Sequence, residues 1–390
     1  MEHAANALEP TRIIIQMVII LFAAKVVGEI AERVCLPAVL GELLAGVILG
    51  GSLLGFIEQN DVLRVLAEFG AIILLFEIGL ESDLEEFLRV GASALVVAVI
   101  GVVAPFAVGY AVSLGFGLDT ITAVYIGATL TATSVGITAR TLCDIGRLRT
   151  PEARIILGAA VIDDVLGLII LAVVVGVIRT HTVSPWEIGK ISFLAIGFLA
   201  GAIAVGIPVA PRVLKIAKRL RTRGMLTISA FIFCFGLAFI ASELKLATIV
   251  GAFAAGLVLA KTEDLAHIQD RIKPVADIFI PIFFVMLGVS VDLSVFSPAN
   301  GSLLPLVGVL ILVAIVMKLF AGLGVLRRGV NRLTVGIGMI PRGEVGLIFA
   351  SFGLTNGVIS PALYSAIIAV VFVTTFITPP FLKLAFRKKP

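Results

Sequence analysis

Charge is scarce in this chain of 390 residues. Only 14% of the residues are Asp, Glu, Lys or Arg, whereas about a quarter are charged in an ordinary soluble domain. Hydrophobic residues make up 59%, and the mean hydropathy is +1.16. Such a composition excludes a soluble globular domain and indicates a protein that crosses a lipid bilayer many times.

Cysteine and histidine are also rare, with three of each. Cys35, Cys143 and Cys234 are scattered without metal-ligand spacing, which excludes a disulfide framework and a zinc site. The net charge of +4 arises from basic residues spread among short loops, so we expect no nucleic-acid partner. We also expect no cofactor, and the partners we do expect are the lipid bilayer and small transported ions.

Long apolar runs occur along the whole sequence, and a spanning helix needs roughly 20 mostly apolar residues. Charged residues, prolines and glycines divide these runs into thirteen predicted transmembrane helices. They cover residues 12–30, 38–57, 62–80, 90–115, 119–139, 155–178, 187–210, 225–242, 246–260, 274–291, 302–326, 333–353 and 361–382.

The basic residues predict how these helices are oriented. An odd number of spans puts the termini on opposite sides, and cytoplasmic loops carry the excess of Lys and Arg. With the C-terminus in the cytoplasm, the other side holds only Arg12, Arg64, Arg179, Lys190 and Lys245. We therefore expect a multi-pass protein of the inner membrane with an extracytoplasmic N-terminus.

Two halves of the sequence resemble each other. Residues 36–49 match residues 246–259 at an offset of 210, with Gly46 aligned to Gly256, and Gly79 aligns with Gly288 at an offset of 209. Seven spans separate the members of each pair, so the two halves have opposite orientations in the membrane. Inverted repeats are typical of transporters whose binding site lies where interrupted helices meet.

The same offset relates two candidate interruptions. Residues 131–134, Thr-Ala-Thr-Ser, lie inside the fifth span, and residues 341–344, Pro-Arg-Gly-Glu, lie inside the twelfth. Proline removes a backbone donor and clashes with the preceding turn, so we expect the twelfth helix to be broken at Pro341. The fold class predicted is an all-α membrane protein with two broken helices that cross at the midplane.

Ionisable residues within spans are costly and are usually functional. Asp163 and Asp164 lie near the centre of the sixth span, and Lys318 lies at a similar depth in the eleventh. Adjacent helical residues point about 100° apart, so the two carboxylates have different roles. One carboxylate can face an aqueous cavity as a cation ligand while the other faces Lys318, which could also be a purely structural counter-ion.

Three further charged residues are candidates. Arg342 and Glu344 flank the predicted break, where they form an ion pair, bind freed backbone groups or ligate the substrate. Glu77 lies near the end of the third span, where it either lines an ion funnel or reaches into water.

These motifs together resemble the bacterial sodium/proton antiporters of the monovalent cation:proton antiporter superfamily. By this resemblance, Asp164 would be the residue that binds Na⁺, and Asp163 would form a salt bridge with Lys318. Thr131 and Ser134 would assist at the crossover. The function implied is electrogenic exchange of Na⁺ for H⁺ by alternating access, with Li⁺ or K⁺ left open as the cation.

The resemblance also implies a homodimer in which different segments of each chain have different roles. It assigns dimerisation to residues 12–80 and 225–291, the ion-binding core to residues 90–178 and 302–382, and a linker helix to residues 187–210. Relatives carry an apolar residue where this chain has Glu77, which leaves the cation selectivity open.

Two other functions could use membrane carboxylates. An intramembrane aspartyl protease needs two carboxylates that share one proton, whereas adjacent positions on one helix diverge, so we do not expect an enzyme. A sodium-coupled symporter of an organic solute can share an inverted-repeat fold, but its site should offer donors for an organic anion. The charged groups here are chiefly acidic, which favours cation exchange.

Overall fold

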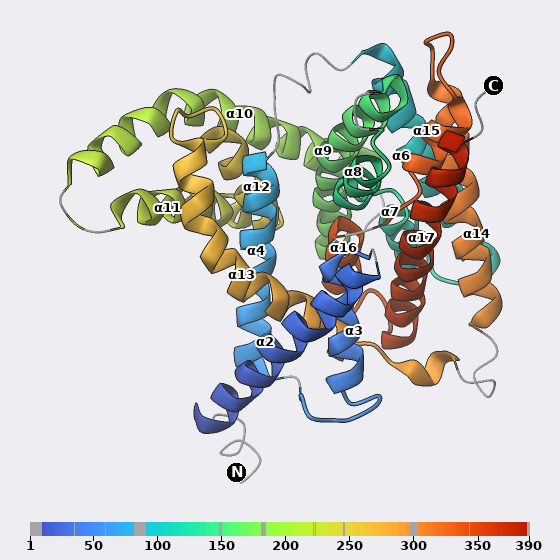
Figure 1. Cartoon of the computed structure of the whole chain (residues 1–390), viewed down its shortest axis with the longest axis horizontal. Coiled ribbons are helices and arrows are strands. Elements are labelled where there is room, and N and C mark those ends of the chain that lie inside the picture. Colours follow the sequence, from blue (N-terminus) through green and yellow to red (C-terminus); the bar gives the residue numbers. More distant parts are fainter. Residues whose placement is uncertain are drawn as a thin grey trace. The chain divides into compact units, whose positions relative to one another are not determined.

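The fold is that of a computed structural model of the chain. It describes residues 10–34, 36–58, 60–81, 91–147, 150–180, 185–220, 222, 224–244, 246–296, 303–342 and 344–387. Helices dominate these ranges, and no strand occurs within them (Figure 1). This agrees with the all-α fold class predicted from the sequence.

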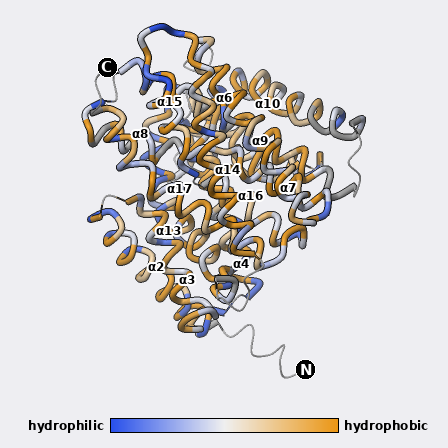
Figure 2. The backbone as a smooth tube through the Cα atoms, turned by 90° about the vertical axis from the view of Figure 1, so that its right-hand side faces the viewer, coloured by the Kyte–Doolittle hydropathy of each residue, from blue (hydrophilic) through white to orange (hydrophobic). Residues whose placement is uncertain are grey.

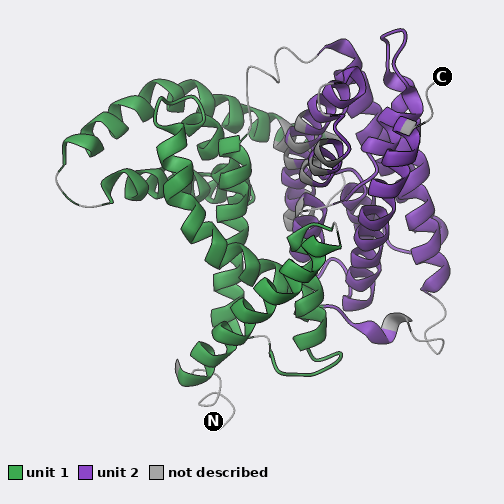
Figure 3. Cartoon of the chain, viewed as in Figure 1, with its two compact units in different colours: residues 1–84, 184–290 green, residues 85–183, 291–390 purple. Residues whose placement is uncertain are grey.

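The chain divides into two compact units, each assembled from two separate stretches of sequence (Figure 3). Unit 1 comprises residues 1–84 and 184–290, and unit 2 comprises residues 85–183 and 291–390. The ranges resemble those predicted for the dimerisation and core domains, but the roles of the two units stay a prediction.

Unit 1 contains seven helices in the residues that are described. They are α2 (Pro10–Arg33), α3 (Ala38–Leu49), α4 (Asp61–Glu81), α10 (Pro185–Arg219), α11 (Met225–Glu243), α12 (Thr248–Leu259) and α13 (Leu265–Val289).

Glycines allow these helices to cross at backbone contact. A Cβ added at Gly46 of α3 would collide with α13 at Val285 and Gly288, and one added at Gly79 of α4 would collide with α12 at Gly256. The glycines that the sequence aligns, Gly46 with Gly256 and Gly79 with Gly288, thus form two equivalent crossings. The internal repeat predicted from the sequence is built into the packing of unit 1.

Unit 2 holds the remaining described helices. They are α6 (Ala92–Gly115), α7 (Thr120–Thr129), α8 (Val135–Asp144), α9 (Pro151–Thr180), α14 (Leu304–Ala321), α15 (Arg332–Gly338), α16 (Glu344–Thr355) and α17 (Pro361–Arg387), with short 3₁₀ turns η2 (Leu293–Phe296) and η4 (Gly322–Gly324).

Two of the predicted spans are broken in unit 2, as expected. The fifth is split into α7 and α8 around residues 130–134, and the twelfth into α15 and α16 around residues 339–342. Helix α6 packs against α7, α9 and α14, and α17 packs against α14, α15 and α16. The residues between the broken halves therefore lie among continuous helices.

Apolar residues run along most of the length of the helices (Figure 2). Among the residues described, eight helices are long and apolar enough to cross a membrane. The other predicted spans correspond to α4, to the shorter α3 and α12, and to the two broken pairs. The exact number of thirteen crossings stays a prediction.

Several predicted boundaries differ from the helices of the structure. Helix α13 begins at Leu265 and not at residue 274, because the polar stretch before Pro274 is still helical. Charge ends an apolar pattern without ending a helix, since Lys, Arg and Glu are good helix formers. Helix α3 ends at Leu49, well before residue 57, and Gly50, Gly51 and Gly55 follow it.

The glycine crossings generate a stability prediction. Gly288→Ala should lower the free energy of unfolding by about 1–3 kcal/mol, because its new methyl group meets the backbone of α3 and overpacking costs this much. Gly236→Ala in α11 is the matched control, since nothing lies within 4 Å of a Cβ added there. Thermal unfolding of the purified protein in detergent measures both. Equal stability of the two variants would contradict a close α3–α13 crossing.

Candidate functional site

The first component of the site is a buried carboxylate on α9. The helix begins at Pro151, whose ring suits the first helical position, and the Thr150 hydroxyl accepts a hydrogen bond from the Ala153 amide. Twelve positions beyond Pro151, the Asp163 side chain is fully buried in unit 2. A carboxylate in this position needs a compensating charge and hydrogen bonds.

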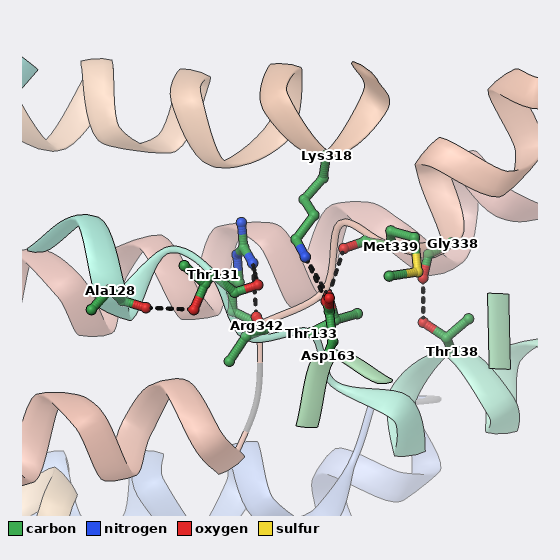
Figure 4. Close-up of polar contacts among 10 residues, drawn as sticks. Ala128, Thr131, Thr133, Thr138, Asp163, Lys318, Gly338, Met339 and Arg342 are labelled. Atoms are coloured by element: carbon green, nitrogen blue, oxygen red, sulfur yellow. Dashed lines mark hydrogen bonds and ion pairs between the residues drawn. The ribbon is translucent and has the colours of Figure 1, made fainter. Parts of the chain in front are cut away.

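Lys318 supplies that charge from α14. Its side chain is fully buried, and its Nζ lies 2.7 Å from Asp163 Oδ2 (Figure 4). Gly101 of α6 leaves space for the ammonium group, because a Cβ there would lie 3.2 Å from Lys318 Nζ. The pair that the resemblance assigned, Asp163 with Lys318, is therefore in contact in the structure.

Thr133 completes a three-membered cluster. Its Oγ1 accepts a hydrogen bond of 2.7 Å from Lys318 Nζ and donates one of 2.5 Å to Asp163 Oδ2. Thr131 and Ser134, on either side of Thr133, were the residues expected here from the family resemblance, and Thr133 was not. The Thr131 hydroxyl instead donates to the Ala128 carbonyl of its own segment. The Thr131 and Thr133 hydroxyls therefore have different partners, because no helical period applies in this stretch.

One oxygen of Asp163 remains open. Oδ1 is buried and has no hydrogen-bond partner within the described parts of the chain. A buried carboxylate oxygen without a donor is costly, and it is an acceptor for a proton, a water molecule or a cation. The ion pair thus occupies only half of the carboxylate.

The two breaks satisfy each other's backbone groups. The Ser134 amide donates to the Pro341 carbonyl at 2.9 Å, and the Thr138 hydroxyl donates to the Gly338 carbonyl at 2.8 Å. From α17, the Thr375 hydroxyl donates to the Arg342 carbonyl at 2.7 Å. Carbonyl groups at and beyond the end of α15 are therefore bonded to the first break, to α8 and to α17.

Arg342, which lies in the second break, binds backbone carbonyls of the first break. Its Nη1 donates to the carbonyls of Thr131 at 3.0 Å and Ala132 at 2.7 Å, beyond the end of α7. A cation near a helix C-terminus is also favoured by the helix dipole. Arg342 is 1% exposed, and the Nε and Nη2 of its guanidinium have no partner among the residues described. One edge of the Arg342 guanidinium, formed by Nε and Nη2, therefore makes no hydrogen bond to a described residue.

Three predicted site residues lie outside this cluster or outside what is described. The backbone of Asp164 belongs to α9 and that of Glu344 begins α16, but their side chains fall outside the described residues. Glu77 lies in α4, which belongs to unit 1. Within the described residues, no group of three or more His, Cys, Asp or Glu could hold a metal ion.

A buried ion pair between two continuous helices, beside two broken ones, is an arrangement suited to moving small ions, and comparison with known proteins decides the family. Residues 17–388 match the profile described as "Sodium/hydrogen exchanger, transmembrane". The chain belongs to this family. Sodium/hydrogen exchangers are transporters and not enzymes, which agrees with the expectation from the sequence, and the chain is a multi-pass membrane protein.

Two curated members of the exchanger family are similar along almost their whole length. A protein of Synechocystis sp. named high-affinity Na⁺/H⁺ antiporter NhaS3 is 42% identical, with 96% of this chain and 90% of that protein aligned. A Bacillus cereus protein named Na⁺/H⁺-K⁺ antiporter GerN is 35% identical, with 96% of each aligned.

A solved structure shares the fold of this exchanger. The sodium proton antiporter MjNhaP1 of Methanocaldococcus jannaschii superposes with a TM-score of 0.71 over 96% of this chain and 98% of that one. The sequences are 18% identical, so this likeness concerns the fold alone. It supports the inverted-repeat architecture that the sequence predicted.

The buried pair makes a prediction about stability. Removing one partner leaves the other charge uncompensated, which typically costs about 3–5 kcal/mol, whereas replacing both partners with apolar residues can be nearly neutral. Lys318→Ala should therefore destabilise the protein more than the double change Asp163→Ala/Lys318→Leu. Thermal unfolding in detergent compares them, with Lys215→Ala on the exposed face of α10 as the control. Losses that simply add in the double variant would show that the two residues are not coupled.

Proposed function

We propose that this exchanger moves Na⁺ in one direction and H⁺ in the other, and that Asp164 is the group for which they compete. The observation that carries the proposal is the buried cluster of Asp163, Lys318 and Thr133 beside the crossing of two broken helices. Asp163 is engaged with Lys318 and Thr133 in this cluster, so Asp164 is the neighbouring carboxylate left for the substrate.

The oxygen atoms needed for Na⁺ are available at this place. Unwound backbone carbonyls and half-helix ends coordinate Na⁺ in transporters with inverted repeats. Residues 130–134 have no helical hydrogen-bond ladder of their own, and Thr131 and Ser134 offer both hydroxyl and backbone oxygens. Together with the Asp164 carboxylate, they form a set of hard oxygen ligands suited to a hard monovalent cation.

Exchange follows from the cost of moving a bare charge. A carboxylate without a partner is unfavourable within the bilayer, so the site changes sides only when a proton or Na⁺ neutralises it. The protein therefore couples the movement of Na⁺ to the movement of protons in the opposite direction, without any enzymatic chemistry. A sodium-coupled symporter would need donors for an organic anion. Of the described donors near the pair, Arg342 Nη1 binds backbone carbonyls and the Thr133 hydroxyl binds Asp163.

The wider setting of the proposal comes from the family resemblance and the charge pattern. The protein works as a homodimer through unit 1 in the inner membrane, with unit 2 moving as the ion-binding core. Its N-terminus is extracytoplasmic and its C-terminus cytoplasmic, which reporters fused to the two ends would test. Relatives named for Na⁺ and for K⁺ leave the choice of cation to be measured.

The first test replaces the proposed ion ligand. Asp164→Asn preserves size and polarity but removes the charge, so a folded and inserted protein should show no Na⁺-driven proton movement. Proteoliposomes with a pH-sensitive dye inside, given Na⁺, Li⁺ or K⁺ in turn, provide the measurement. Asp119→Asn is the control, because asparagine can take over the cap that the exposed Asp119 forms for α7. Exchange near the wild-type rate in Asp164→Asn would remove this residue from the role of carrier.

A second test concerns the charge moved in each cycle. If Lys318 releases a proton when its pairing with Asp163 breaks, exchange moves net charge. Lys318→Gln should then retain some cation/proton exchange but lose its dependence on membrane potential. Rates are compared in proteoliposomes with and without a K⁺/valinomycin potential. A potential dependence that survives in Lys318→Gln would transfer the second proton to Asp163.

A further inference from the structure

Tyr125 is a fully buried tyrosine in the middle of α7, the first half of the broken fifth span. Its hydroxyl donates a hydrogen bond to the carbonyl of Phe349 in α16, the second half of the broken twelfth span. A buried phenol needs such a partner, because its polar end is otherwise unsatisfied. One side chain thus joins a half-helix of the first broken span to a half-helix of the second.

Helix α16 has a recess that receives the tyrosine ring. A Cβ added at Gly353, one turn beyond Phe349, would lie 2.4 Å from Cε1 and 2.8 Å from Cζ of Tyr125. Glycine is unfavourable in the interior of a helix, so its presence against the ring indicates that close approach is what this position provides. Both helices therefore contribute to the contact, α7 with a ring and α16 with a missing side chain.

The contacts between these two segments follow an antiparallel order. At the crossing, Arg342 binds the carbonyls that follow α7 (Figure 4). Further along, the Tyr125 hydroxyl meets Phe349, and near the start of α7 the Thr122 hydroxyl donates to the Val358 carbonyl at 3.0 Å. A single contact would allow α7 to pivot on α16, whereas contacts at three levels fix the direction of one half-helix along the other.

The middle contact lies close to the proposed ligands of the cation. Tyr125 precedes Thr131 by six residues, and Phe349 follows Arg342 by seven. At 3.6 residues per turn, the hydrogen bond is roughly two helical turns from each break. A displacement of α7 along α16 therefore changes the separation between the oxygens of the first break and the groups of the second.

That separation decides which cation fits. Monovalent cations of equal charge differ mainly in radius, so a site of oxygen ligands distinguishes them by the spacing of the ligands and by how rigidly that spacing is held. An unwound segment has no helical hydrogen-bond ladder to hold it. Its rigidity must come from the half-helix that carries it and from the contacts of that half-helix.

We propose that Tyr125 is a positioning residue that sets the cation affinity and selectivity of the exchanger by fixing α7 against α16, without touching the ion. The proposal rests on the proposed exchange function and deepens it. The repeat has no second copy of this contact, because at the offset of 210 Tyr125 corresponds to Val335, which has no hydroxyl, and Gly353 corresponds to Cys143. The hydrogen bond is thus a property of α7 and α16 alone.

The first experiment uses Tyr125→Phe, which removes the hydroxyl and keeps the ring. Proton movement in proteoliposomes, driven by graded concentrations of Na⁺, Li⁺ or K⁺ at one pH, gives KM and the maximal rate for each cation. KM for the cation that the wild type prefers should rise about fivefold, which the loss of one hydrogen bond can produce. Cations that already fit the ligands poorly should lose less, so the ratio of KM values falls while the maximal rate is little changed.

Tyr110→Phe is the matched control. Tyr110 is a half-buried tyrosine of α6 that forms no side-chain hydrogen bond within the described parts of the chain, so the same chemical change should leave every KM as in the wild type. A Tyr125→Phe variant with wild-type KM values, or with a lower maximal rate and unchanged KM values, would overturn the proposal.

A second variant disturbs the same contact from the other helix. Gly353→Ala places a methyl group where the ring lies, and Gly308→Ala in α14 is its control, since nothing lies within 4 Å of a Cβ added there. Both changes at the contact break one hydrogen bond, so Tyr125→Phe/Gly353→Ala should raise KM no further than Gly353→Ala alone. Effects that multiply in the double variant would contradict a shared contact. Gly353→Ala carries the comparison if Tyr125→Phe does not fold.

A readout without transport separates this inference from the proposed function. A bound cation raises the unfolding temperature by mass action, so Tyr125→Phe in detergent should need about five times more of the preferred cation for the same rise. Wild-type protein without cation-driven proton movement would refute the exchange function. An active wild type whose KM values and thermal stabilisation by cations are unaffected by Tyr125→Phe would refute the positioning role alone.

Discussion

The cost of burying charge is the constraint on which unit 2 depends. Asp163 and Lys318 have no access to solvent, and each is tolerable only because the other lies 2.7 Å away. Such a pair contributes little net stability, since the desolvation of two ions offsets their attraction. Its importance is geometric, because it fixes α9, α14 and the first break at one point. A change in the charge of Asp163 or Lys318 therefore alters contacts of all three elements.

The same constraint acts on the backbone of the broken helices. An unpaired N–H or C=O within the bilayer costs several kcal/mol, so a helix can be broken only where other groups bind the freed ends. Arg342 binds two carbonyls beyond α7, and Ser134, Thr138 and Thr375 bind carbonyls at or beyond the end of α15. The crossing is thereby held by side chains and not by a continuous ladder. A junction made of a few side-chain bonds can be rearranged by the loss or gain of one.

Sequence reasoning could find the charged members of the site because charge is rare in this chain. Asp163 and Lys318 are conspicuous inside apolar runs, and Pro341 breaks a helix for a local reason. Thr133 could not be singled out, since each of the polar residues at 131, 133 and 134 is equally compatible with an unwound segment. Which one meets the ion pair depends on how α9 and α14 pack. The predicted start of α13 was also wrong, because helix propensity continues through charged residues that end an apolar pattern.

The two halves of the repeat differ in the residues that carry charge. The aligned glycines of unit 1 occupy equivalent crossings, and α9 and α17 both begin at a proline, Pro151 and Pro361, at the offset of 210. At that offset Asp163 corresponds to Val373, and Arg342 corresponds to Ala132, whose carbonyl it binds. Two equivalent inverted backbones would expose equivalent unpaired groups and hold ions equally on both sides of the crossing. Because Asp163 and Asp164 lie in one half and Lys318 and Arg342 in the other, the crossing is asymmetric in charge, and the proposed exchange needs only a single ion site.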